Sequence, residues 1–557
     1  MLTASNLFDY FEEVPEEGSQ APWAARPPLR PQSRCDLKLM PRSPGWQSDP
    51  EAIAALERIE SEPWVARIKR AESSVDVLLD DQWIETVGQA LLEGDAREDT
   101  LADLGTECRF AVQFWDANAT KALHAGHLRN LALGNSIAAT LAQAGADVER
   151  RSLISDVGRA MGEAMAGVVN SGQHVHLWPS GSEKSDHFVG DCYAEYVKSE
   201  HALAPSDSEQ PEDSLTRELT MRGDAADELI KRVLSGDREA LELWSKTRAW
   251  AIGGQRKTLA RLGIAFDRVF FESDYLPEMR ELTEQGLREG RFMRRDDGVI
   301  FYPTGHEDFD ELPLVRGDGV PTQHMRAMAY WMSAPDMQEL HSMQICGIEW
   351  VAHVTYRCQL MGELMALEST EREMDPTQTI FHGMVSRQKR ALSSSQEGAL
   401  LIDELMDQID AQLAANDAGR MVQRTHPHPE RIAPQIALGF FLTKPLTPEV
   451  DFDPEGLLVA RGSPGWDLVR ARARATGGTP SDLRPAEEPD FRFAVVQSEI
   501  YKRHLRIALE RLDVTPLARH VDHLARWFME RDRSEHTSRA VATLLDRGAR
   551  GLGLERR

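Results

Sequence analysis

The sequence predicts an α/β protein in which a doubly wound parallel sheet carries a helical insertion and precedes an α-helical C-terminal domain. Residues 109–115 have the apolar pattern of a strand, and residues 126–144 follow a long amphipathic helical pattern that Gly145 can end. The next apolar stretch, 148–154, indicates a second strand parallel to the first. This strand–helix–strand order is half of a doubly wound nucleotide-binding sheet, and residues 270–405 supply the other half.

Composition divides the chain into four regions. Residues 1–50 are rich in Pro, Ser and Gly, which predicts a mostly disordered N-terminal segment. Residues 51–105 mix short helical and extended patterns and predict a small α+β appendage. Residues 106–410 hold the nucleotide-binding catalytic domain, with a polar helical insertion at about 170–265. Residues 411–557 predict a helical C-terminal domain.

Size and composition are those of a globular protein, with 557 residues of which 41% are apolar and 28% charged. No apolar run approaches the roughly 20 residues that span a bilayer, so we expect no membrane association. The acidic N-terminus lacks the order of a secretory signal. The five cysteines are scattered and form no CxxC pair. We therefore expect a cytoplasmic protein without disulfides and without a metal site.

The net charge of −26 argues against nonspecific binding to DNA or RNA, because phosphate contacts need Lys and Arg. The charge is uneven, however. Residues 461–557 hold 19 Lys and Arg against 14 Asp and Glu, which gives this end an excess of positive charge. This end is either an RNA-binding domain or a solvated helical surface rich in arginine.

The segment from Gln113 to Arg129 runs from a strand into the start of a helix and holds the pattern His124-Ala125-Gly126-His127. Backbone N–H groups and the helix dipole favour anions at such a place. The two imidazoles can hydrogen-bond phosphate oxygens, and glycine lets the backbone approach a ligand. Taken alone, the pattern also fits two structural histidines.

The wider segment DANATKALHAGHLRN resembles the SPN-x-x-K-P-x-H-x-GHLRS segment of arginyl-tRNA synthetases, which are class I aminoacyl-tRNA synthetases. The matching positions are Asn118, Lys121, His124, Gly126, His127, Leu128 and Arg129. Further similar blocks are SLISDVGRAMGE, KSDHFVGDCYAEYV, ALELWSKTRAW, LVRGDG and FHGMVSRQKRALSSSQEGALLIDEL. The resemblance covers about residues 60–480 and implies a Rossmann-like catalytic domain followed by a shortened, anticodon-binding-like domain.

The resemblance also implies roles for individual residues. The catalytic positions are His124, His127, Lys121, Ser393 and Ser394. The ATP-binding positions are Gly126, Gly347, Glu349, Gly383, Met384, Val385 and Lys389. The positions of the amino-acid pocket are Asn118, Gln113, Asp156, Gln323, Ala327 and Trp350. The implied reaction is attack of an amino-acid carboxylate on the α-phosphate of ATP, with Mg²⁺ on the phosphates, followed by transfer to a tRNA ribose hydroxyl.

Four pocket positions depart from the family. Its glutamate on the first strand is Gln113 here, and its tyrosine and aspartate after the RSDG-like turn fall at Gln323 and Ala327. Trp350 replaces the glutamine of the GxEQ-like motif. Burying a guanidinium without carboxylates is costly, so we expect a neutral or polar amino acid in place of arginine. The alternative is that the alignment slips near residue 320.

The second signature is degraded as well. Where the family shows KMSSRKG-like residues, this chain has ALSSSQE at 391–397. The serine hydroxyls survive and the loop lysines do not, although Lys389 and Arg390 just upstream can supply charge. The alternative is a relic impaired in adenylation.

Three functions remain open. The first is a synthetase-like ligase of drifted specificity that passes an amino acid to tRNA through its basic C-terminal domain. The second is a tRNA-independent amino-acid ligase of specialised metabolism. The third is a non-catalytic RNA-binding or regulatory paralogue. We expect a monomer in each case.

Overall fold

The computed structural model describes Leu7, Pro31 and residues 23–26, 35–42, 45–93, 109–172, 184–203, 222–307, 309–336, 339–365, 378–387, 390–391, 400–458, 463–475 and 477–555. The predicted site residues Lys389, Ser393 and Ser394 lie outside these ranges. Among the described helices, none is both long and apolar enough to cross a bilayer.

A five-stranded parallel sheet lies at the centre of the molecule, with strand order β12-β11-β5-β6-β7. The strands are β5 (Arg109–Gln113), β6 (Asp147–Ile154), β7 (Arg268–Phe271), β11 (His341–Gly347) and β12 (Gln378–His382). The chain runs from β5 outward to β7 and later returns to the opposite side of β5. The sheet is therefore doubly wound, as predicted, and its topological switch point lies between β5 and β11.

The first crossover confirms the predicted strand–helix–strand unit. The 3-10 turn η5 (Ala125–His127) leads into α3 (Leu128–Gln143), which is buried along nearly its whole length. A Cβ at Gly134 would lie 2.1 Å from the Cβ of Phe114, so glycine allows the helix to pack closely on the end of β5. Gly145 turns the chain into β6 with a φ of 95°, the left-handed conformation that favours glycine.

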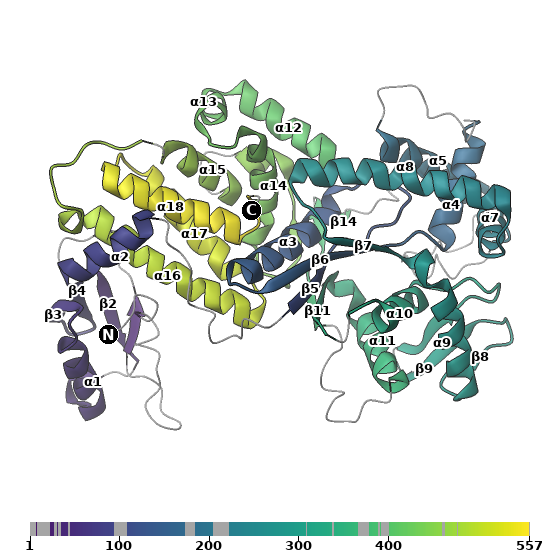
Figure 1. The fold of residues 1–557 in the computed structure, drawn as a ribbon, viewed down its shortest axis with the longest axis horizontal. Helices are drawn as coiled ribbons and strands as arrows, with labels where there is room; N and C mark the ends of the chain where they lie inside the picture. The colour runs from purple at the N-terminus through teal and green to yellow at the C-terminus, as the bar shows by residue number, and fades with distance from the viewer. Residues whose placement is uncertain are drawn as a thin grey trace.

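The predicted helical insertion is present beyond the edge strand β7 (Figure 1). It consists of α4 (Arg159–Asn170), α5 (Ser185–Leu203), α7 (Ala225–Leu234) and α8 (Arg238–Leu262). Asp224 and Asp237 cap α7 and α8, because each side chain accepts a hydrogen bond from a backbone N–H of the first turn. The insertion has an apolar core of its own.

A small antiparallel sheet and three helices follow β7. The helices are α9 (Leu276–Arg288), α10 (Gln323–Ser333) and α11 (Val351–Leu364), and the strands are β8 (Met293–Arg294), β9 (Ile300–His306) and β10 (Phe309–Val315). These elements share a separate apolar core. They carry the loops that lead into α10 and α11, on which three predicted pocket residues lie.

The N-terminal appendage starts earlier than the sequence predicted. Its antiparallel sheet has the order β1-β2-β4-β3, and its elements are β1 (Trp23–Arg26), β2 (Leu37–Pro41), α1 (Pro50–Glu60), β3 (Val65–Arg70), β4 (Val75–Leu79) and α2 (Asp81–Glu93). Strands β1 and β2 therefore lie within the segment expected to be mostly disordered. Leu37 and Leu39 are fully buried and alternate with the half-buried Lys38 and Met40, a pattern typical of a strand with one buried face.

The C-terminal region is helical, as predicted. Its helices are α12 (Ile402–Ala415), α13 (Asp417–Thr425), α14 (Ile432–Leu442), α15 (Pro464–Arg474), α16 (Pro489–Arg511), α17 (Thr515–Met529) and α18 (Glu535–Gly551). The boundary expected at residue 410 falls inside α12, so this helical block begins at about residue 402. The chain then returns to the catalytic domain, where Thr140 and Asn135 of α3 donate to the carbonyls of Gly551 and Gly553 at 2.8 and 2.7 Å.

Two arginines of α15, in the region that the sequence assigns either to RNA binding or to a solvated helical surface, bond to neighbouring helices. Arg472 is buried, pairs with Asp546 at 2.7 Å and also bonds Glu555. Arg474 donates to the carbonyl of Met529 at 3.1 Å. These guanidinium groups hold the C-terminal helices together, because a buried charge needs such partners.

Candidate active site

The predicted ATP-binding residues lie at the carboxyl ends of three neighbouring strands. His124 and His127 follow β5, Gly347 ends β11, and Gly383 follows β12. Strand β11 pairs with both β5 and β12, so the three loops share one edge of the sheet. The short strand β13 (Val385–Arg387) also contacts η5. In open α/β sheets this edge, at the switch point, is where ligands bind.

The two histidines of the first motif are held by backbone hydrogen bonds. The Nδ1 of His124 accepts from the N–H of Gly126 at 3.2 Å, and the Nδ1 of His127 accepts from the N–H of His124 at 3.1 Å. Because each Nδ1 is an acceptor, the hydrogen of each neutral ring is on Nε2. The ring centroids are 3.9 Å apart, so two N–H donors are presented side by side.

Both rings are neutral at physiological pH. Burial lowers the pKa of His124 well below its ordinary value, with further contributions from His127 and Lys121. Burial, and then the charge of Lys121, lowers the pKa of His127 to about 4. Lys121 therefore supplies positive charge beside two neutral donors. That set fits the oxygens of a polyphosphate.

The segment after the second signature is bonded directly to the first motif. The N–H of Ala125 donates to the carbonyl of Leu400 at 2.8 Å, and the N–H of Ile402 donates to the carbonyl of Leu123 at 3.0 Å. The predicted Ser393 and Ser394 precede this point by a few residues. The chain thus places Leu400 and Leu401 beside the first motif, whereas the serines lie outside the described residues.

Arg129 has a positioning role that the sequence motif alone did not reveal. Its buried guanidinium donates to the carbonyls of Gly383, Pro445, Leu446 and Pro448 at 2.6–2.9 Å. Burial lowers its pKa to about 10. Arg129 thereby ties the start of α3 to the loop after β12.

Two of the predicted ATP-binding residues after β12 use a backbone group for a hydrogen bond within the chain. The N–H of Gly383 donates to Leu446 at 2.8 Å, and the carbonyl of Met384 accepts from Val450 at 2.9 Å. These two backbone groups already have partners in the chain. The side chain of Met384 is 43% exposed and offers an apolar surface there.

Gly347 and Glu349, two of the predicted ATP-binding residues, lie together at the end of β11. The exposed carboxylate of Glu349 folds over Gly347, where an added Cβ would be 2.2 Å from its Oε1. A Cβ at this position would displace the end of the exposed Glu349 side chain from its place over residue 347. A carboxylate at the end of β11 can accept hydrogen bonds from ribose hydroxyls.

The loop that carries Asn118 is fixed from two sides. The N–H of Ala119 donates to the carbonyl of Ser155 at 2.9 Å. The amide of Gln255, on α8, donates to the carbonyls of Asn118 and Lys121 at 2.9 and 2.8 Å. Gln255 is fully buried and was not identified from the sequence. The side chain of Asn118 remains exposed at the sheet edge.

Asp116 is a further candidate that the sequence analysis did not single out. It accepts from the Nε2 of Gln113 at 3.0 Å and from the N–H of Leu153 at 3.4 Å. Its side chain is exposed, but the surrounding protein desolvates the carboxylate and thereby raises its pKa to about 6. The hydrogen bonds from Gln113 and Leu153 and the charge of Arg357 lower the pKa by a smaller amount. The similar family segment has serine at this place, and that difference was a visible signal.

Asp156 does not line an open pocket, in contrast to the expectation. It is fully buried, and its carboxylate accepts from Arg248 at 2.8 Å and from the N–H and Oγ of Ser273 at 2.9 and 2.7 Å. With its carboxylate oxygens engaged in this way, Asp156 positions α8 against the segment after β7.

The predicted pocket residues of α10 are half-buried. Gln323 begins the helix and Ala327 lies one turn later, so both share a face. Between them, Arg326 pairs with the buried carboxylate of Glu272 at 2.5 Å. Trp350, also half-buried, packs its ring 5.2 Å from that of His353.

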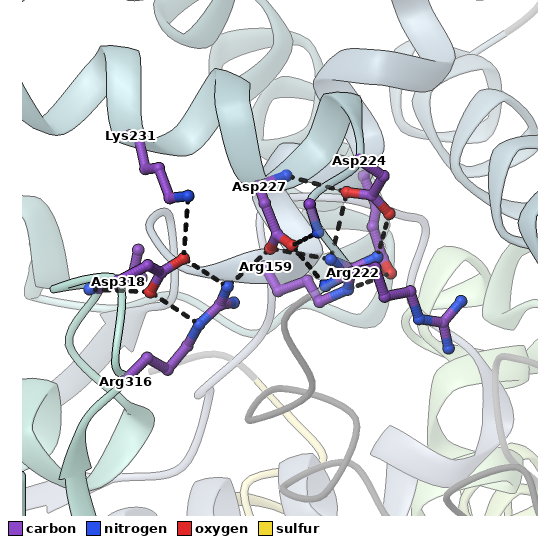
Figure 2. A network of polar contacts seen from close by, with 10 residues as sticks. Arg159, Arg222, Asp224, Asp227, Lys231, Arg316 and Asp318 are labelled. Atoms are coloured by element: carbon purple, nitrogen blue, oxygen red, sulfur yellow. Dashed lines mark hydrogen bonds and ion pairs between the residues drawn. The ribbon is translucent and has the colours of Figure 1, made fainter. Parts of the chain in front are cut away.

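A buried ionic network joins the insertion to the loop before α10 (Figure 2). Asp227 of α7 lies between Arg159 and Arg316, at 2.8 and 2.7 Å. Arg316 also pairs with Asp318 at 2.7 Å, and Arg159 pairs with Asp224 at 2.6 Å. The network therefore fixes the turn that leads into α10 and sets the position of Gln323.

Comparison with known proteins bears on this arrangement. The family model of class I tRNA synthetase (R) catalytic domains matches residues 87–439. The chain belongs to this family. It is 27% identical over 377 residues to arginine–tRNA ligase of Treponema pallidum, covering 66% of this chain and 59% of that protein. It is 29% identical over 387 residues to that of Treponema denticola, covering 68% and 61%. The chain thus spans about three fifths of the length of these relatives.

Solved structures share the fold. Thermus thermophilus arginyl-tRNA synthetase gives a TM-score of 0.66 at 19% identity, covering 99% of this chain and 97% of that one. The arginyl-tRNA synthetase of Plasmodium falciparum gives a TM-score of 0.63 at 14% identity, with the same coverage. The class I synthetase fold with a helical C-terminal domain is therefore confirmed.

Proposed function

We propose that this family member is an ATP-dependent ligase that activates an amino acid other than arginine as an aminoacyl-adenylate and transfers it to the 3′ end of a tRNA. The observation that carries the proposal is the pair of neutral Nε2–H donors of His124 and His127 beside Lys121. Such a pair binds a polyphosphate whose charge shifts as the α-phosphate reacts.

In the proposed reaction the amino-acid carboxylate attacks the α-phosphate in line and pyrophosphate leaves. His124 and His127 donate to the phosphate oxygens, and Lys121 offsets their charge. Mg²⁺ enters with ATP and neutralises the phosphates. Asn118 and the carboxylate of Asp116 hold the α-ammonium group, so that the reacting atoms are oriented before the step.

The drift away from arginine is supported by the charges of the pocket. The carboxylates of Asp156 and Glu272 are engaged by Arg248 and Arg326 of the chain itself. Gln113 stands where the family has glutamate. A substrate guanidinium would then be buried without the paired carboxylates that it needs.

Fewer observations bear on which molecule accepts the activated amino acid than on the adenylation step. The excess positive charge of residues 461–557 supports tRNA, whereas the internal ion pairs of Arg472 favour the second candidate, a tRNA-independent amino-acid ligase. Among the described residues, Cys35, Cys192, Cys346 and Cys358 are free thiols, which supports placing the enzyme in the reducing cytoplasm.

ATP–pyrophosphate exchange over all standard amino acids, with and without bulk tRNA, tests the proposal. We expect exchange with an amino acid other than arginine, and its loss in His127→Ala. The variant His306→Ala, an exposed histidine of β9, is the control. Exchange with arginine alone would contradict the drift, and no exchange would favour the regulatory paralogue. Product formation that survives ribonuclease would favour the tRNA-independent ligase.

A further inference from the structure

Two glutamines mark the sheet face on which the amino-acid pocket is built. Gln113 of β5 and Gln344 of β11 are paired in parallel register and are both buried. They flank the switch point. Residues paired in register project to the same face of a sheet. Gln113 is also the position at which the family places a carboxylate for the substrate.

The orientation of the Gln113 amide is set by a carboxylate. Its Nε2 donates to Oδ2 of Asp116 at 3.0 Å, and a carboxylate only accepts. The other end of the amide is therefore its acceptor, Oε1. That buried oxygen has no hydrogen-bond partner among the described residues.

A buried guanidinium from α11 lies over the same face. Arg357 donates to Oε1 of Gln344 at a long 3.4 Å, and its Nε has no partner within the described part of the chain. No described carboxylate forms an ion pair with it. Gln344, which Arg357 contacts, is paired in register with Gln113, and Gln113 in turn bonds Asp116. Burying a guanidinium with so few partners is costly, unless a ligand completes its hydrogen bonds.

A third under-satisfied group belongs to the same cluster. His324 of α10 is buried, and neither of its ring nitrogens has a partner in the described ranges. Its ring stacks on that of His353, with centroids 5.1 Å apart, and His353 in turn packs against Trp350. The charge of Arg357 adds to burial in lowering the pKa of His324. His324 thus adds a buried polar group without a partner among the described residues to an aromatic cluster that includes the predicted pocket residue Trp350.

We propose that Arg357 determines the side-chain specificity of this site, and that the substrate is an amino acid with a carboxamide side chain, of the glutamine or asparagine class. The inference rests on the proposed function. The substrate's amide oxygen accepts from Arg357, and its amide N–H donates to Oε1 of Gln113.

An arginine side chain and a carboxylate side chain each fail on one of these two contacts. A guanidinium has five donors and no acceptor, and it would meet the charge of Arg357. A carboxylate satisfies Arg357 but leaves Gln113 without a donor. A carboxamide supplies both groups. A site built around such hydrogen bonds discriminates strongly against analogues that leave buried groups without partners.

Direct binding tests the inference apart from catalysis. Isothermal titration of the full chain, with a non-hydrolysable ATP analogue present, compares glutamine, asparagine, glutamate, aspartate and arginine. We expect glutamine or asparagine to bind at least tenfold more tightly than its carboxylate analogue and than arginine. Tightest binding of arginine, or binding of no amino acid, would overturn the proposal.

Variants separate specificity from folding. Arg357→Met should lower the carboxamide-to-carboxylate affinity ratio at least tenfold, while Arg295→Met, on an exposed arginine, should leave it unchanged. If Arg357→Met does not fold, Arg357→Lys keeps the charge and tests the same ratio. An unchanged ratio in a folded variant refutes the role of Arg357. Carboxamide binding without pyrophosphate exchange would refute the proposed function and leave this inference intact. Exchange only with an amino acid that is neither arginine nor a carboxamide would refute this inference and leave the proposed function intact.

Discussion

The two halves of the site are built on different physical principles. The nucleotide half presents neutral donors, because backbone groups orient His124 and His127 and burial keeps both rings uncharged. The amino-acid half is built from charges, and most of them are neutralised within the chain, as Glu272 is by Arg326. The first half therefore depends on a short local motif. The amino-acid half depends on ion pairs between residues far apart in the sequence, so one substitution changes the charge balance for all the partners of that residue.

The largest effect on stability should follow from removing one carboxylate of the buried ionic network that fixes the turn before α10. Asp227→Asn removes the buried carboxylate that bridges Arg159 and Arg316, and with it one charge-assisted hydrogen bond to each guanidinium (Figure 2). We expect the free energy of unfolding to fall by about 3–5 kcal/mol, measured by urea denaturation. Asp297→Asn, in an exposed pair with Arg295, should cost about 0–1 kcal/mol. If both variants lowered the free energy of unfolding by the same amount, the network would not stabilise the fold around the pocket.

The second effect concerns the nucleotide half. His127→Ala removes one phosphate donor and should lower the exchange rate by about 10²–10³-fold, a change typical of losing one donor to a developing charge. His127→Gln, which returns an N–H donor near the position of Nε2, should recover part of that loss. Circular dichroism of both variants serves as the folding control. An unchanged rate in folded His127→Ala would remove the motif from the chemistry.

How far the sequence alone predicts the molecule follows the same division. The sheet, the helical insertion and the first motif were predictable, because strand and helix periods and the run His124–His127 are local signals. Local pattern did not reveal Arg357, Gln255 or the pairing of Glu272, since their meaning depends on neighbours that only the folded chain brings together. At the N-terminus, composition predicted disorder where the structure has a strand. The prolines of residues 27–31 dominated that prediction and concealed the alternating buried positions of β2.

The pH dependence should separate the halves further. The pKa of Asp116 is raised to about 6, so its carboxylate is lost as the pH falls below that value. The KM for the amino acid should then rise, by up to about tenfold per pH unit. With excess Mg²⁺, the KM for ATP should stay flat from pH 7 to pH 5, because the pKa of His127 is only about 4. Asp116→Asn should bind the amino acid weakly at every pH. Parallel profiles for both substrates would contradict the assignment of Asp116.

The smallest effect tests whether the halves are independent. The side chain of Met384 is exposed at the nucleotide edge, and a thioether contributes about 0.3–1.5 kcal/mol against an aromatic ring such as adenine. Met384→Ala should therefore raise the KM for ATP roughly two- to tenfold and leave stability within about 0.5 kcal/mol. Met421→Ala, at a still more exposed methionine on α13, should change neither quantity. If Met384→Ala raised the KM for the amino acid by the same factor, the halves would be coupled through the sheet edge. The two halves would then be built separately but would not function independently.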